Sequence, residues 1–200
     1  TVFLVNPASA GGSTGKRWPE LAHRAAALGL SGDALVSEEP GGLTSLAQEA
    51  IAGGAQRLVV VGGDGSVNEV VNGIAGRDDV EIALSGEIRT IDLGLVTFRT
   101  WAGDEARSHF ANVASAGISG AIAQRANETT KALGGKISYY WSTLAVFARW
   151  QTGEMRIAVN GEARAQKIID VLVANGRYLA CGMMMLPEAE PDDGLFDVLV

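Results

Sequence analysis

The sequence contains one cysteine, Cys181, and two histidines among its 200 residues. One cysteine cannot form an internal disulfide, so a disulfide-stapled scaffold is excluded and a reducing compartment is favoured. No apolar run approaches the ~20 residues that a membrane-spanning helix needs, and the N-terminus lacks the basic and then apolar segments of a secretory signal. We therefore expect a cytoplasmic protein with no transmembrane segment.

The sequence also lacks an excess of positive charge. Its 16 basic and 23 acidic residues give a formal net charge of -7, whereas a general nucleic-acid binder usually has the opposite sign. Hydrophobic residues make up 47% and charged residues 20%, which is close to the globular average and excludes a disordered or fibrous chain. We expect one or two folded domains and no nucleic-acid partner.

The first part of the chain alternates short β-branched runs with helical patterns. This rhythm predicts βαβ units around a parallel sheet. The expected strands are 2–5, 34–36 and 58–61, and the expected helices are 18–28, 43–51 and 67–74. Pro19 would then lie in a first helical turn, where proline is accepted. Gly53 and Gly54 are expected to close the second helix.

From about residue 92 the pattern becomes antiparallel. Residues 156–164 alternate around Asn160-Gly161, which is a strong hairpin signal. Strands are also expected at 168–173 and 195–200, and helices at 121–131 and 137–150. We expect an α/β nucleotide-binding domain over residues 1–92 and a β-rich substrate domain over 93–200. The chain starts without Met and stops in an apolar run, so we expect it to be part of a longer protein, truncated at its C-terminus.

A glycine turn, Gly62-Gly63-Asp64-Gly65-Ser66, joins the apolar strand at 58–61 to the next helix. Glycines allow backbone N–H groups at a helix N-terminus to approach an anion closely, so the turn is typical of a phosphate site. Asp64 would repel phosphates unless a cation intervenes or the carboxylate accepts a hydroxyl proton. The turn therefore indicates Mg²⁺ and phosphoryl transfer, with Asp64 as the catalytic candidate.

Two features near this turn have alternative explanations. Ser66 and Glu69 have the spacing of a capping box, so they would either satisfy helix-end donors or contact a ligand. The loop over residues 6–17 invites comparison with a Walker A motif, but Ala10 replaces the first glycine and Arg17 replaces the final Ser/Thr. That loop is then either a ligand-binding loop at a strand end or a flexible surface loop.

Three segments, taken together and in order, are more specific than the glycine turn alone. They read VNPAS at 5–9, VVGGDGSVNEVVNG at 60–73 and PEAEPDDGLFDV at 187–198. As a set they resemble the family of bacterial diacylglycerol kinases and lipid kinases, relatives of sphingosine kinases. The resemblance implies a Rossmann-like domain of the NAD kinase and phosphofructokinase type, followed by a β-sandwich domain, with ATP and a lipid hydroxyl meeting between the two.

The resemblance also implies site residues. ATP-contact positions fall on the ends of the first two strands and on the glycine turn with its helix, namely Asn6, Pro7, Ser9, Ser37, Gly62, Gly63, Asp64, Gly65, Ser66, Val67, Asn68 and Glu69. A Mg²⁺ site falls on Glu190, Asp193 and the carbonyl of Leu195, and hard oxygen ligands on a tight turn suit such a cation. A solvated turn is the alternative for these acidic residues.

Two departures from the family pattern stand out. The kinases have a further strand and a Gly-Thr-Gly-Asn-Asp segment after the glycine-turn helix, whereas here residues 76–81 follow almost at once. We expect a segment to be missing from the chain near residues 76–78. The family's Asp-Gly-Glu, whose carboxylate is a proposed general base, is also absent, because Asn160-Gly161-Glu162 is better explained as a hairpin turn.

The function that these features favour is an ATP-dependent lipid kinase. It would transfer the γ-phosphoryl group to a lipid hydroxyl, converting diacylglycerol to phosphatidic acid, with Mg²⁺ as cofactor. The lipid would be presented at a membrane surface, so the protein would be cytoplasmic and peripheral to the membrane; a homodimer is one candidate for its assembly. The alternatives are NAD kinase, which shares the glycine turn, and a lipid- or nucleotide-binding regulator without turnover.

Three further patterns are assigned mainly to structure. The aromatic segment 137–150 is expected to be a core helix, with a lipid entrance or membrane contact as the alternative. Met183, Met184 and Met185 are expected to lie in a buried strand or to form an apolar wall for an acyl chain. Asn112 and Asn175 are expected at a sheet edge or a turn.

Overall fold

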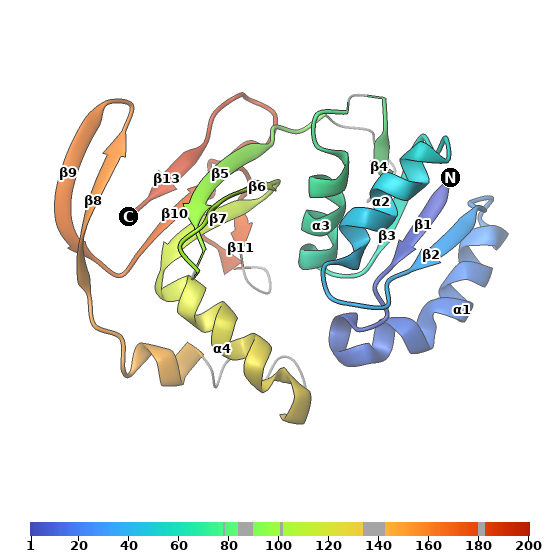
Figure 1. Cartoon of the computed structure of the whole chain (residues 1–200), viewed down its shortest axis with the longest axis horizontal. Helices are drawn as coiled ribbons and strands as arrows, with labels where there is room; N and C mark the ends of the chain where they lie inside the picture. Colours follow the sequence, from blue (N-terminus) through green and yellow to red (C-terminus); the bar gives the residue numbers. More distant parts are fainter. Residues whose placement is uncertain (78, 84–89, 101, 134–142, 180–182) are drawn as a thin grey trace. The chain divides into compact units, whose positions relative to one another are not determined.

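The computed structural model describes residues 1–200 except 78, 84–89, 101, 134–142 and 180–182, and of residues 126–133 only the backbone. The chain forms two compact units, Thr1–Ala111 and Asn112–Val200, which are traced in Figure 1. Each unit is described by itself.

The first unit is built on a four-stranded parallel sheet. Its strands are β1 (Val2–Val5), β2 (Asp33–Val36), β3 (Arg57–Val61) and β4 (Glu81–Ala83), in the order β2-β1-β3-β4. Val2 of β1 is opposite Asp33 of β2 and Leu58 of β3. The three strands expected from the sequence are confirmed, and β4 supplies the strand after the glycine-turn helix that we had not found.

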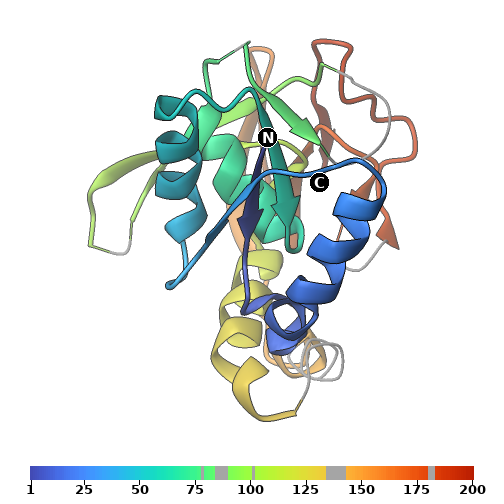
Figure 2. The ribbon, with the colours of Figure 1, turned by 90° about the vertical axis from the view of Figure 1, so that its right-hand side faces the viewer.

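Helices cover both faces of this sheet. The helices are α1 (Ser13–Ala27), preceded by the 3-10 turn η1 (Ser9–Gly12), then α2 (Gly42–Ala52) and α3 (Asp64–Ile74). α2 and α3 pack on one face and α1 on the other, as Figure 2 shows from the side. Gly73 lets α2 and α3 approach closely, because a Cβ there would lie 2.6 Å from the Thr44 carbonyl oxygen.

Two helices begin earlier than expected. α1 begins at Ser13 rather than at residue 18, so Pro19 lies inside the helix and not in its first turn. α3 begins at Asp64 rather than at residue 67, so part of the glycine turn is already helical. Both first turns consist of small or polar residues, which carry no apolar periodicity for a sequence pattern to detect.

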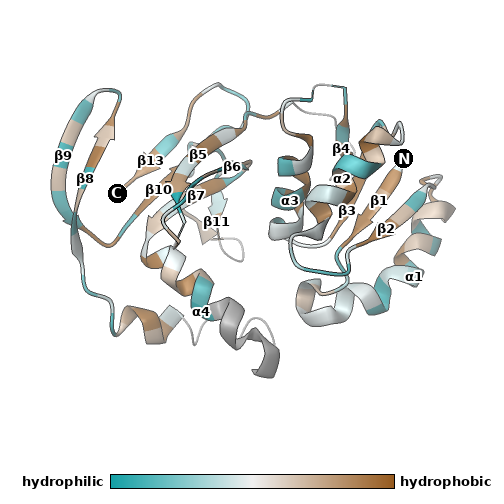
Figure 3. Ribbon diagram, in the orientation of Figure 1, coloured by the Kyte–Doolittle hydropathy of each residue, from teal (hydrophilic) through white to brown (hydrophobic). Residues whose placement is uncertain are grey.

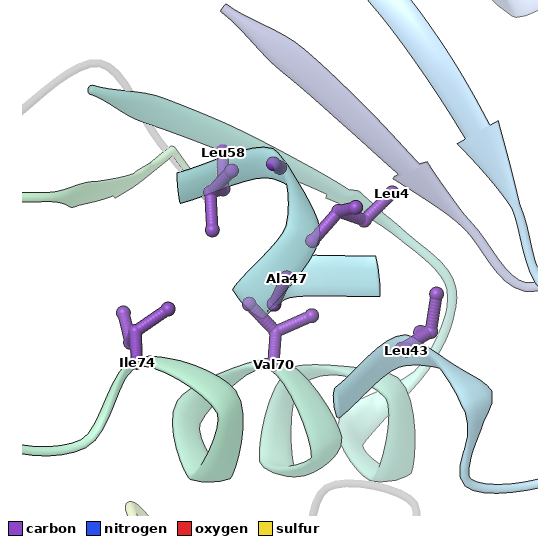
Figure 4. Packing of buried hydrophobic residues seen from close by; sticks show 7 residues of the cluster. Leu4, Leu43, Ala47, Leu58, Val70 and Ile74 are labelled. Carbon is purple, nitrogen blue, oxygen red and sulfur yellow. The ribbon is translucent and has the colours of Figure 1, made fainter. Parts of the chain in front are cut away.

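One apolar cluster fixes the first unit. Its labelled members in Figure 4 come from β1, β3, α2 and α3 and are Leu4, Leu43, Ala47, Leu58, Val70 and Ile74, joined by Ala50. Leu4, Leu43, Leu58 and Val70 are completely buried. The cluster packs the two helices on the sheet and thereby holds the carboxyl ends of the central strands in place.

A hairpin completes the first unit. β5 (Gly94–Arg99) and β6 (Glu105–Phe110) pair antiparallel, as the sequence predicts for this part of the chain. Asn72 of α3 holds β6: its Oδ1 accepts from the His109 N–H at 2.7 Å, and its Nδ2 donates to the His109 carbonyl at 2.9 Å. This hairpin lies between the boundary expected at residue 92 and the division of the units at 111.

The second unit consists of α4 (Ile118–Leu133) and short antiparallel sheets. β7 (Val113–Gly117), β10 (Asp170–Ala174) and β13 (Asp197–Leu199) form one sheet in the order β13-β10-β7. β8 (Gly153–Val159) pairs with β9 (Glu162–Ile168), and β11 (Tyr178–Leu179) pairs with β12 (Met183–Met184). The turn between β8 and β9 has left-handed φ values of 51° at Asn160 and 87° at Gly161, which confirms the predicted hairpin.

Two sequence expectations about burial in the second unit are wrong. Of segment 137–150, residues 137–142 lie outside the description; in the helical remainder, Leu144 and Phe147 are exposed rather than in a core. Met183, Met184 and Met185 are exposed, so they are not a buried strand. Asn112 and Asn175 lie in bends beside β7 and β10, as expected; Asn175 is completely buried, and its N–H donates to the Asn112 carbonyl at 2.7 Å. Local sequence patterns do not show which face of a helix or strand packs against another element.

A search of the described residues for membrane-spanning helices finds none of sufficient length and hydropathy.

Candidate active site

The candidate site residues of the first unit follow the carboxyl ends of three strands. Asn6 follows β1, Ser37 follows β2 and Gly62 follows β3. In the order β2-β1-β3-β4 the chain places β2 on one side of β1 and β3 on the other, so the topological switch point lies between β1 and β3. Open α/β sheets bind ligands beyond the strand ends at such a point. The fold therefore brings the predicted residues to one edge.

Asn6 joins the end of β1 to the glycine turn. Its N–H donates to the Val61 carbonyl at 2.9 Å, and its side-chain Nδ2 donates to Ser66 Oγ at 3.0 Å. Its Oδ1 accepts from the Ala8 N–H at 3.1 Å. Ser66 is buried, so this bond fixes the glycine turn across the switch point.

The capping-box interpretation of Ser66 and Glu69 is wrong. Gly63 is the N-cap of α3, and no side chain caps that end. The Glu69 Oε2 instead accepts from the Leu43 N–H at 3.1 Å, and the Glu69 carbonyl accepts from Thr44 Oγ1 at 2.9 Å. A carboxylate is favourable at the N-terminus of α2. Glu69 therefore ties α3 to α2; a ligand contact by this residue stays a prediction.

The glycines of the turn differ in what the fold requires of them. A Cβ at Gly62 would lie 2.3 Å from Ser66 Oγ, so the fold itself excludes a larger residue there. Gly63 has extended backbone, with φ -106° and ψ -169°, and a Cβ would meet nothing within 4 Å. Gly65 is helical and also has open space around its Cβ position. Neither the backbone nor the packing accounts for glycine at 63 and 65.

Asp64 is the first residue of α3 and is exposed. Its Oδ1 accepts from the Gly65 N–H at 2.8 Å, an arrangement favoured at a helix N-terminus. The carboxylate thus sits between the two glycines that have open space. Val67 and Asn68 follow on the same helix, half-buried and exposed respectively.

The loop after β1 has a defined conformation, and its contact with a ligand stays a prediction. Residues 9–12 form η1 and α1 begins at once. Ser9 Oγ lies 2.9 Å from the Asn6 carbonyl oxygen and 2.6 Å from Thr14 Oγ1. A Cβ at Gly15 would lie 2.8 Å from Pro7 Cβ, so Pro7 packs directly on α1. Ser37 is buried and its hydroxyl donates to the Glu39 carbonyl.

The acidic turn of the second unit carries the residues predicted to bind Mg²⁺. Asp193 Oδ1 accepts from the Leu195 N–H at 2.9 Å, and Glu190 Oε1 lies 3.9 Å from an Arg177 guanidinium nitrogen. Both carboxylates and Leu195 are exposed. The donors are oxygens of the kind that Mg²⁺ prefers, but Arg177 competes for Glu190. No group of three or more His, Cys, Asp or Glu side chains suited to a metal occurs among the described residues.

Sequence reasoning missed Thr44 and Asn72, which link the glycine-turn helix to its neighbours. Thr44 binds the Glu69 carbonyl, and Asn72 binds the backbone of β6. Asn72 is an amide in a helix interior, where asparagine is unfavourable. That mismatch is the one signal in the sequence that such a tertiary contact exists.

Comparison with protein families matches the two parts of the chain to two domain models. Residues 1–96 match the diacylglycerol kinase catalytic domain. Residues 112–200 match the YegS C-terminal NAD kinase beta sandwich-like domain. The predicted fold class, an α/β domain followed by a β-sandwich domain, is therefore confirmed.

Curated relatives match at low identity over most of the chain. A diacylglycerol kinase of Staphylococcus carnosus is 23% identical over 226 residues, covering 99% of this chain and 71% of the relative. A protein of Pseudomonas aeruginosa named "Probable lipid kinase YegS-like" is 26% identical, covering 82% of this chain and 61% of the relative. The chain therefore spans only part of the length of these relatives.

The alignment with the Staphylococcus carnosus protein bears on the segment that we expect to be missing from this chain. The match to the Staphylococcus carnosus protein is 226 residues long and this chain has 200 residues, so the relative carries residues without a counterpart here. β4 is present after α3. The position of the missing segment near residues 76–78 stays a prediction.

A solved structure of a diacylglycerol kinase from Bacillus anthracis has the same fold. It matches with a TM-score of 0.62 and 23% sequence identity, covering 98% of this chain and 71% of the solved chain. The two domain models, the order in which they occur and this shared fold agree with the three sequence segments that carry the resemblance. The chain belongs to the family of diacylglycerol and lipid kinases.

Proposed function

We propose that the chain carries the nucleotide site of an ATP-dependent lipid kinase, which phosphorylates the hydroxyl of diacylglycerol to give phosphatidic acid. The observation that carries this proposal is the unexplained glycine at positions 63 and 65, on either side of Asp64. Residues without a Cβ, beside a helix N-terminus at a switch point, allow close approach of phosphates to backbone N–H groups. In this proposal residues 1–92 bind the nucleotide and 93–200 the lipid.

The reaction exchanges two bonds to phosphorus. The lipid hydroxyl oxygen forms a bond to the γ-phosphorus, the bond from that phosphorus to the β–γ bridging oxygen breaks, and ADP leaves. The hydroxyl proton passes to a base, for which the exposed Asp64 carboxylate is the candidate in this chain. Positioning by the turn supplies most of the catalysis, since phosphoryl transfer needs little covalent chemistry from the protein.

Mg²⁺ would neutralise the charge that develops on the phosphates. Asp64 is the carboxylate nearest to the proposed phosphate site in sequence. The turn with Glu190, Asp193 and the Leu195 carbonyl would hold a second divalent cation that stiffens its own unit, once that cation has displaced the nearby Arg177 side chain from Glu190.

A pair of glycine variants tests the nucleotide site. Gly65→Ala adds a Cβ in open space near the start of α3, and Gly120→Ala does the same near the start of α4. Both changes should leave the melting temperature equal or higher, since alanine is the better helix former. Calorimetric titration with ATP should show at least tenfold weaker binding for Gly65→Ala alone. Equal affinity in both variants would contradict the site.

The role of the carboxylate is tested by Asp64→Asn in the intact protein. The amide keeps the size and the helix-start preference but cannot accept a proton. We expect diacylglycerol phosphorylation to fall by roughly 10²–10⁴-fold, with an unchanged melting temperature. Activity equal to that of the parent protein would remove Asp64 from the catalytic machinery.

A second candidate is a lipid- or nucleotide-binding regulator without turnover. Two observations favour this candidate. The sequence lacks the kinase segment Gly-Thr-Gly-Asn-Asp, and the 226-residue alignment with the Staphylococcus carnosus protein includes residues of that relative without a counterpart here. The two candidates predict different outcomes for the intact parent protein. A regulator would bind ATP with the dependence on Gly65 described above, yet would show no phosphate transfer to diacylglycerol above the rate of Asp64→Asn.

A further inference from the structure

A helical turn in the second unit presents large apolar side chains to solvent. Residues 143–147 are helical, and the chain continues through Trp150 into β8. Leu144 and Phe147 are 64% and 62% exposed, and their spacing of three places them on one helix face. Phe147 is the most exposed aromatic side chain among the described residues. In Figure 3 the short helix that precedes β8 is coloured as hydrophobic.

The other side of this turn is packed. Ala145, Val146 and Trp150 are only partly exposed, and the Trp150 N–H donates to the Phe147 carbonyl at 3.3 Å. The indole Nε1 of Trp150 is buried, so the turn is anchored in its unit by this side chain. Solvent exposure of the remaining leucine and phenylalanine costs hydrophobic free energy that only a ligand or a partner surface would recover.

The segment that begins with this turn has a net charge of opposite sign to that of the whole chain. Residues 143–168 carry four basic side chains against two acidic ones, all exposed: Arg149, Arg156, Arg164 and Lys167 against Glu154 and Glu162. The net charge of the chain is -7. Arg156 and Lys167 share one face of the hairpin with Glu154, whereas Arg164 is on the other face and lies 3.7 Å from Glu162. The exposed apolar pair is thus followed in the chain by a segment of net positive charge.

We propose that Leu144, Phe147 and Arg149, with Arg156 of β8 and Lys167 of β9, which share one face of their hairpin, form the face through which the protein binds an anionic lipid surface. Leucine and phenylalanine insert at the interface, and basic side chains attract anionic headgroups. A second copy of the chain fits this face poorly, because a two-fold contact would bring its arginines together. The inference deepens the proposed function. It rests on that function only for the reason that the protein would bind a lipid surface at all.

Cosedimentation with vesicles, without nucleotide, tests this face in the intact protein. One set of vesicles is phosphatidylcholine and the other contains equal parts of phosphatidylcholine and phosphatidylglycerol. The parent protein should bind the anionic set alone. Leu144→Ser combined with Phe147→Ser should weaken binding about tenfold or more, and Arg149→Gln should weaken it and reduce its salt dependence. The matched control is Leu28→Ser in the first unit, where Leu28 is 87% exposed.

The outcomes separate this face from the kinase site. Asp64→Asn should bind vesicles as the parent does, so loss of phosphoryl transfer leaves this proposal standing. Equal binding by the serine variant and the parent would overturn it, as would equal binding to neutral vesicles or an equal loss in Leu28→Ser. A dimer in analytical ultracentrifugation that the serine variant dissociates, with vesicle binding unchanged, would assign the face to a second copy instead.

Discussion

The two units bury their apolar side chains to different extents. In the first, β1 is almost wholly buried and a single cluster joins two strands to two helices. In the second, nearly every residue of β9 is exposed, and the main buried cluster consists of Leu172, Ala174, Leu186 and Ala189. Parallel strands need crossover helices that cover both faces, whereas antiparallel ribbons do not.

This difference has a consequence for the two proposed sites. The glycine turn and Asn6 lie at strand ends that a buried cluster fixes, so their geometry is set before a ligand binds. The acidic turn and the Leu144–Phe147 face lie on exposed segments. We expect the nucleotide site to be preorganised and the second unit to gain order from its ligands.

The largest effect on stability should come from the core of the first unit. Leu58→Ala removes a completely buried side chain of β3 and should lower the free energy of unfolding by about 2–5 kcal/mol. Val159→Ala in β8, where the valine is 40% exposed, should change it by no more than about 0.5 kcal/mol. Urea unfolding measures both. Similar losses in the two variants would contradict the comparison between the units.

A cation should stabilise the second unit more than the first. Mg²⁺ at a hundredfold excess over its dissociation constant should raise stability by about 2.7 kcal/mol. Asp193→Ala should abolish this gain, whereas Asp192→Ala, on the same turn but outside the predicted ligand set, should retain most of it. Thermal melts with and without Mg²⁺ provide the measurement. If the melting temperature of the parent protein does not change with Mg²⁺, the cation site is ruled out.

The smallest effect concerns the link between two helices of the first unit. Glu69→Ala removes the carboxylate that accepts from the Leu43 N–H and should cost about 1 kcal/mol, as other lost helix caps do. Glu49→Ala, an exposed change near the end of α2, should cost nothing. Urea unfolding measures the free energy of unfolding of both variants. If Glu69→Ala instead weakens ATP binding without loss of stability, Glu69 is a ligand contact and not a tie between helices.

Sequence patterns located the strands well and the helix starts less well. The runs at 2–5 and 58–61 are short, β-branched and bounded by turn residues, so local preference and burial agree there. The first turns of α1 and α3 are made of glycine, serine, threonine and aspartate. Those residues have weak helix preference, and in α3 the buried Val70, Val71 and Ile74 fix the body of the helix to which the first turn belongs.

For the candidate site, too, the sequence indicated some features and missed others. The glycine turn after a buried strand indicated phosphate chemistry by itself, and the order of three segments indicated the kinase family. The Asn6–Ser66 bond and the contact of Glu69 with α2 joined residues far apart in sequence. A capping box was one of two local explanations for Ser66 and Glu69, and it failed because these side chains bind Asn6 and the Leu43 N–H instead.

The sequence alone determined the alternation of strands and helices, the hairpin at Asn160-Gly161 and the family, because each depends on short stretches of residues with specific conformational preferences. Only the tertiary structure decided which side chains are buried. Phe147 and Met184 are exposed and Asn175 is buried, although hydrophobicity alone predicts the reverse. Burial depends on which elements pack together, and the free energy of that packing comes from contacts between residues distant along the chain.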